Sequence, residues 1–78
     1  MLKLKNIAMS SGVVSAEYDP EIAGDVGKIA IDVESGMVVE KQLANIDDGF
    51  PLYFNKALEW LRKAKRDNLP KEYILMWY

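Results

Sequence analysis

Cysteine and histidine are both absent from the 78 residues of this chain. Their absence removes disulfide bonds, the usual transition-metal ligands, the commonest general base and the strongest nucleophile. Side-chain packing alone must therefore stabilise the fold. We accordingly predict that the protein is not an enzyme and has no catalytic residues, no metal ligands and no cofactor.

Long apolar runs are also missing. No segment approaches the roughly 18 consecutive apolar residues of a membrane span. Residues 2–5 alternate leucine with lysine, unlike the apolar core of a secretion signal. We therefore expect a cytoplasmic protein with no membrane partner. The length allows one hydrophobic core, so residues 1–78 are predicted to form a single small domain.

The first quarter of the chain predicts a β-hairpin. Alternation of polar and apolar residues over positions 2–9 shifts phase at Asn6, which indicates a strand with a β-bulge. Ser11 and Gly12 supply turn chemistry, and the return strand up to Tyr18 places its larger apolar residues on one face.

A second hairpin follows an acidic loop. Residues 28–33 and 37–43 read as strands around Gly36, which can adopt the positive φ of a tight turn. Residues 19–27 show no sustained period and predict a loop. The acids of this region do not match the spacing of a calcium-binding loop, so we interpret them as solvated residues rather than cation ligands. They are Glu17, Asp19, Glu21 and Asp25.

An amphipathic helix is predicted from Pro51 onward, because proline is tolerated in the first helical turn and apolar residues then recur every three or four positions. Asp47 and Asp48 lie near its positive end, and either could cap it. Pro70 prevents continuation, so the helix is expected to end near Asp67.

The chain closes with an apolar and aromatic run from Tyr73 to Tyr78, which predicts a terminal strand. Because the run does not alternate, we expect both of its faces to be covered. The strand would lie inside the sheet, under the helix on one face and against a partner or another sheet on the other. The predicted fold class is α+β. It comprises an antiparallel sheet, built from a four-stranded meander plus a C-terminal strand, packed against one amphipathic helix in the order β-β-β-β-α-β.

No motif in the sequence names a function, and two hypotheses stay open. We favour a small non-catalytic interaction or accessory protein that self-associates, as a homodimer, or binds a protein partner. Its contact surface would be the second face of the sheet or the edge beside the terminal strand, since tyrosine and tryptophan are common interface anchors. The expected contact residues are Tyr73, Leu75, Trp77 and Tyr78.

The alternative is a nucleic-acid-binding module that uses the basic end of the helix. Residues 49–78 hold six basic residues against three acids, whereas residues 1–48 hold four lysines against nine acids. The expected phosphate contacts are Arg62, Lys63, Lys65 and Arg66. We rank this hypothesis second, because the chain is acidic as a whole and such cations also complement a helix dipole or pair with Glu59.

Overall fold

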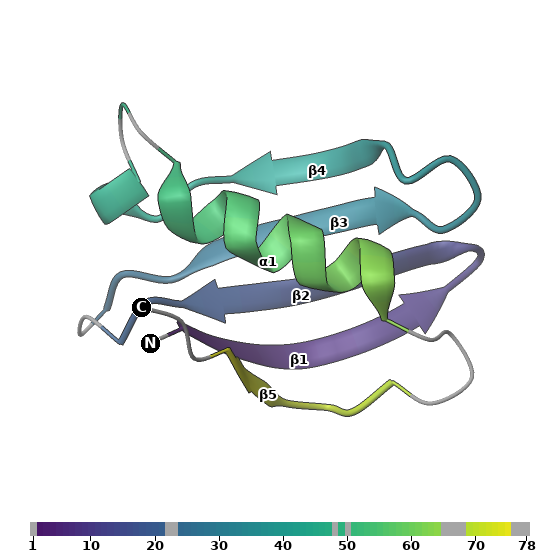
Figure 1. The fold of residues 1–78 in the computed structure, drawn as a ribbon, viewed down its shortest axis with the longest axis horizontal. Coiled ribbons are helices and arrows are strands. Elements are labelled where there is room, and N and C mark those ends of the chain that lie inside the picture. The colour runs from purple at the N-terminus through teal and green to yellow at the C-terminus, as the bar shows by residue number, and fades with distance from the viewer. Residues whose placement is uncertain (1, 22–23, 48, 50, 65–68, 76–78) are drawn as a thin grey trace.

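The computed structural model describes residues 2–21, 24–47, 49, 51–64 and 69–75. It shows a five-stranded antiparallel sheet with one α-helix lying across one face (Figure 1). The predicted class and element order are confirmed. The elements are β1 (Leu2–Ser10), β2 (Val13–Asp19), β3 (Gly27–Asp32), β4 (Val38–Gln42), the 3₁₀ helix η1 (Asn45–Asp47), α1 (Leu52–Lys63) and β5 (Tyr73–Leu75).

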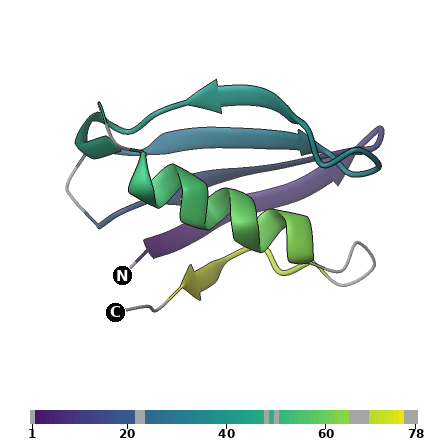
Figure 2. The same cartoon turned by 45° about the horizontal axis from the view of Figure 1, so that its top comes forward.

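The strands lie in the order β4-β3-β2-β1-β5. The first four form a meander, and β5 returns beside β1, where Leu2 lies opposite Leu75 and Leu4 opposite Tyr73. Figure 2 shows α1 on one side of the sheet. None of the described helices or strands covers the other side, which we call the bare side. The two edges of the sheet are therefore β4 and β5.

The predicted bulge and first turn are confirmed. Asn6 has a φ of 53°, and the register between β1 and β2 shifts between Lys5 and Ala8. Ser11 and Gly12 have φ angles of 53° and 78°, the left-handed pair that a two-residue hairpin turn requires.

The core lies between α1 and the sheet. From α1 the buried side chains are Phe54, Ala57 and Leu61, the stripe that helical spacing predicted. From the strands and the segment before η1 they are Leu2, Leu4, Ile7, Val14, Ala16, Tyr18, Ile29, Ile31 and Ala44.

The opposite face of the sheet is polar. Lys5 Nζ lies 3.7 Å from Asp19 Oδ2, and Asn6 Nδ2 donates to Glu17 Oε2 at 3.0 Å across the same pair of strands. Alternation along β1 and β2 thus places charged groups on this face.

The predicted end of the helix was wrong. α1 ends at Lys63, because Ala64 is extended with a ψ of 142° and its N–H donates the last helical bond to the Trp60 carbonyl. The chain must return to β1, where the Ile7 N–H donates to the Lys71 carbonyl at 3.0 Å. Four more helical residues would carry the chain about 6 Å further along the helix axis before that return.

The predicted position of the terminal strand was also wrong. β5 is an edge strand rather than an interior one. Within the single chain Tyr73 is 43% exposed and Ile74 is 50% exposed, so these two residues are not covered on both faces. Residues 76–78 lie outside the described part of the chain. An unbroken apolar run is compatible with a buried interior strand and with an exposed edge strand that can pair with another chain. The sequence alone does not distinguish these two positions.

Candidate partner-contact surfaces

A buried carboxylate fixes the position of α1 against the sheet. Asp47, at the end of η1, is fully buried. The backbone N–H groups of Tyr53 and Phe54 donate to its Oδ1 and Oδ2 at 3.0 and 2.9 Å. Asp47 therefore caps the first turn of the helix from outside it, where the positive end of the helix dipole favours a negative charge. Asp48 lies outside the described residues.

Tyr18 ties this cap to the centre of the sheet. Its hydroxyl donates to Asp47 Oδ2 at 2.7 Å and accepts from the Ala44 N–H at 2.8 Å. The Tyr18 ring meets the Phe54 ring edge-on, with centroids 5.9 Å apart. These contacts of the Tyr18 hydroxyl and ring join the start of α1 and the segment before η1 to the centre of the sheet.

Asp25 plays a similar part at η1, which contradicts its interpretation as a solvated loop residue. It is buried, and it accepts hydrogen bonds from the backbone N–H groups of Asn45 and Ile46. Within the described residues, no three acidic side chains lie close enough to hold a metal ion. Glu17 and Asp19 instead make separate local contacts, Glu17 with Asn6 and Asp19 with Lys5.

The environment of Tyr18 predicts a pH dependence. Burial, together with the Asp47 and Asp25 carboxylates, raises the pKa of Tyr18 above its ordinary value, although the Ala44 N–H acts in the opposite direction. In the unfolded chain this phenol loses its proton near pH 10. The stabilisation by Tyr18 should therefore be complete below about pH 10 and decline as the pH rises above it.

Phenolate absorbance checks this prediction. Tyr18 should titrate only as the chain unfolds at alkaline pH, and the Tyr18→Phe variant should lose that late step. If every tyrosine titrated near pH 10 while the helix signal in circular dichroism persisted, the predicted protection of Tyr18 would be wrong.

The β5 edge carries two of the four expected contact residues. Tyr73 and Leu75 lie on the helix side of the sheet, because they face the buried Leu4 and Leu2 across the β1–β5 pair. The Tyr73 ring stacks on Trp60 of α1, with centroids 4.8 Å apart. Trp77 and Tyr78 lie outside the described residues.

The β4 edge was not expected from the sequence as a contact surface. All five β4 residues are exposed. Val39 is 56% exposed, and Met37, just before the strand, is 66% exposed. The signal that could have indicated this edge is the run of three consecutive apolar residues after the turn, Met37, Val38 and Val39, which does not alternate.

Basic residues at the end of α1 have local partners. Arg62 Nε donates to the Gly36 carbonyl at 3.0 Å, and Lys63 Nζ lies 3.3 Å from Glu59 Oε1. The predicted Glu59–Lys63 pairing is confirmed. Lys65 and Arg66 lie outside the described residues, so phosphate binding by the four cations stays a prediction.

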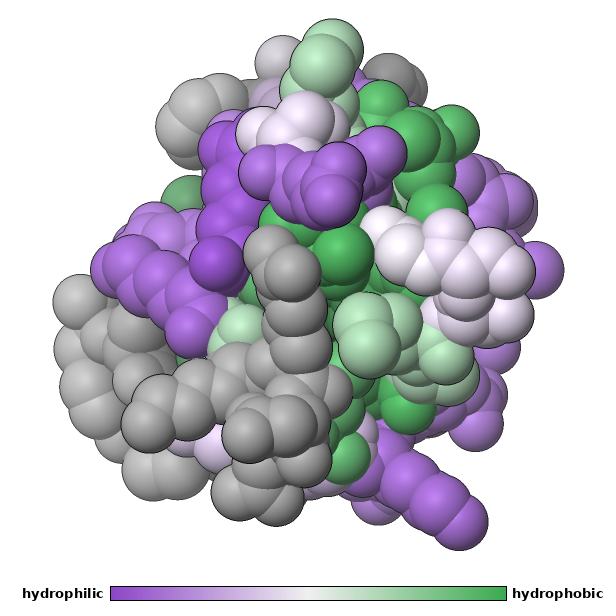
Figure 3. All heavy atoms as spheres, turned by 90° about the vertical axis from the view of Figure 1, so that its right-hand side faces the viewer, coloured by the Kyte–Doolittle hydropathy of each residue, from purple (hydrophilic) through white to green (hydrophobic). Residues whose placement is uncertain are grey.

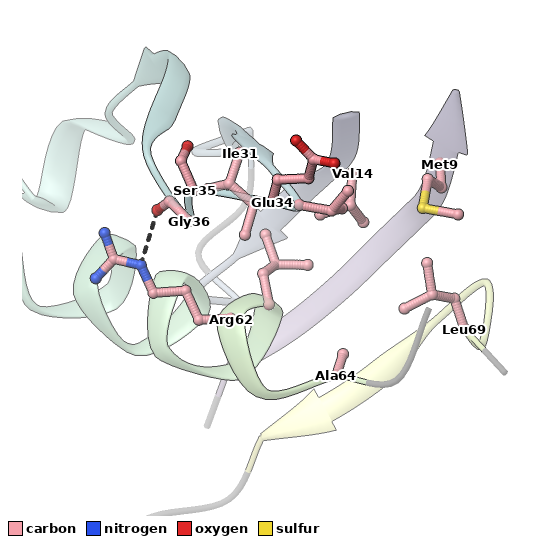
Figure 4. Close-up of a pocket in the computed structure, with 11 residues that line it drawn as sticks. Met9, Val14, Ile31, Glu34, Ser35, Gly36, Arg62, Ala64 and Leu69 are labelled. Carbon is pink, nitrogen blue, oxygen red and sulfur yellow. Dashed lines mark hydrogen bonds between the residues drawn. The ribbon is translucent and has the colours of Figure 1, made fainter. Parts of the chain in front are cut away.

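A pocket of about 300 Å³ opens where the β3–β4 turn meets the end of α1. Figure 3 shows apolar side chains at this end of the molecule between hydrophilic ones. In the close-up of Figure 4, Arg62 turns toward Gly36, while Met9 and Leu69 line the opposite side of the pocket. Its lining is largely aliphatic, with polar groups from Glu34, Ser35 and Arg62.

Comparison of the chain with protein-family models, with curated proteins and with solved structures gives no match. In the parts of the chain that the structure describes, no helix has the length and apolar character of a membrane crossing. The fold places the protein in the α+β class, with a five-stranded antiparallel sheet and one helix packed on it.

Proposed function

We propose that the protein is a small non-catalytic interaction protein that self-associates by pairing β5 with β5 of a second copy. The observation that carries this proposal is the chemistry of the edge. Tyr73, Ile74 and Leu75 contain no charge, and Tyr73 and Ile74 are about half exposed. An uncharged, exposed edge strand is a template for pairing with another chain.

Two-fold symmetry fits this strand. Antiparallel pairing centred on Ile74 sets Ile74 against its own copy and Tyr73 against Leu75 of the second copy. All these pairs are apolar or aromatic, and such cross-strand pairs stabilise a sheet. The Trp60–Tyr73 stack holds the Tyr73 ring in place before a partner arrives, which reduces the entropy lost on association.

The contact would be small. Three paired residues per chain bury far less than the roughly 1,600 Å² of a standard interface, so we expect a dimer that dissociates on dilution. Trp77 and Tyr78 follow β5 in the sequence after Met76, and they belong to the same proposed contact. Because the paired residues are uncharged, salt should change the association little.

Light scattering after size exclusion, over a series of concentrations, tests the proposal. The mass should rise from 8.9 kDa toward twice that value as concentration increases. The Ile74→Lys variant should remain at the monomer mass, because two lysines would lie opposite each other in the two-fold pairing.

The matched control is Val39→Lys, which adds the same charge to the other edge of the sheet. It should leave the concentration-dependent mass unchanged. A wild-type chain that stays at 8.9 kDa at every concentration, or a dimer lost equally in both variants, would rule out pairing through β5.

A further inference from the structure

We propose that the β4 edge binds an extended segment of a different protein by strand addition. In the sequence of that segment, an acidic residue is directly followed by a basic residue, and aliphatic residues come next. β4 lies at the opposite edge of the sheet from β5, so this inference is independent of the proposed dimer. Every β4 residue is exposed, and alternate backbone N–H and C=O groups of an edge strand point away from its neighbour.

The charges of β4 lie on opposite faces. Lys41 faces Ile29 across the β3–β4 pair and so lies on the helix side, where its Nζ is 5.1 Å from the centre of the Phe54 ring. Glu40 faces Ala30 and lies on the bare side. Within the described residues, Glu40 makes no ion pair or side-chain hydrogen bond.

These positions define the partner. An antiparallel segment needs an acid opposite Lys41 and a base opposite Glu40. Because the segment runs in the opposite direction, the acid comes first in its sequence. Beyond the base it meets Val39 and Val38, which are 56% and 36% exposed, so aliphatic residues fit there.

A second copy does not fit this edge as well. Full antiparallel overlap of β4 with itself is centred on Glu40 and sets this residue against its own copy. Directly opposed side chains lie on the same face of a sheet, so the next register of two copies is shifted by two residues, and it sets Lys41 against itself. Like charges directly opposite each other destabilise a strand pair.

Two capped peptides of identical composition test the proposal against the full chain. The probe is Thr-Gln-Glu-Lys-Val-Val-Thr, and its isomer has glutamate and lysine exchanged. In NMR titrations up to about 1 mM peptide, the probe should shift the backbone amides of residues 38–42. The affinity of the isomer should be lower by a factor of about five or more, because both charge pairs become repulsive.

A charge-swapped variant provides the reciprocal control. Glu40→Lys combined with Lys41→Glu should reverse the preference, so that the isomer binds more tightly than the probe. Both positions are exposed, and an unchanged amide spectrum elsewhere would show that the variant folds. Absence of binding by the probe, equal binding of the two peptides, or shifts confined to β5 would overturn the proposal.

Discussion

Replacement of Asp47 with alanine is expected to lower the free energy of unfolding by about 3 kcal/mol, from loss of the helix cap and an unpaired buried hydroxyl at Tyr18. A chain of this length is expected to have a total stability of roughly 4–12 kcal/mol. The thermal midpoint should therefore fall by more than about 10 °C. Thermal and urea denaturation followed by circular dichroism measure the change.

Asp32→Ala is the matched control for this variant. Asp32 Oδ1 also accepts two backbone N–H groups, from Glu34 and Ser35, but in a turn at the surface where water can replace it. Its loss should cost under about 1 kcal/mol. If the two variants melted alike, burial of the Asp47 carboxylate would not be what makes the cap important.

Gly27→Ala is expected to be the second most destabilising change. A Cβ atom at Gly27 would overlap the Tyr18 ring and lie 2.7 Å from the Gln42 carbonyl oxygen of β4. The ring would have to move, and its hydrogen bonds to Asp47 and Ala44 would be strained. We expect a loss of about 3 kcal/mol, the upper part of the range for overpacking, measured by the same denaturation experiments.

Gly24→Ala separates this overlap from the general effect of replacing a glycine. An added Cβ at Gly24 meets no atom within 4 Å, although its φ of 76° disfavours alanine. The expected cost is about 1 kcal/mol of backbone strain. A Gly27→Ala variant no less stable than Gly24→Ala would show that the Tyr18 ring is free to move.

The order of elements could be predicted because each strand of the meander pairs with its neighbour in sequence. Alternation alone then assigns Tyr18 to the core face, and a phase shift alone locates the bulge at Asn6. These signals are local, and the structure confirms them. The helix end was predicted wrongly because it depends on the distant bond between Ile7 and Lys71.

The buried network could not be predicted for the same reason. Asp47 and its partner Tyr18 are 29 positions apart, and nothing near Asp47 distinguishes it from Asp48. The position of β5 likewise depends on which edge of the meander it joins. Exposure of Tyr73 and Ile74 follows from that choice rather than from their own sequence.

The unequal chemistry of the two edges sets a limit on polymerisation. In a dimer paired through β5, the ten-stranded sheet would end at both sides in a β4 strand. There the opposition of Glu40 to its own copy disfavours a third subunit. Growth into a fibril requires that the exposed edge strand pair with a strand of another copy at each step. Assembly would thus close at two subunits, which protects a chain with an uncharged edge from aggregation.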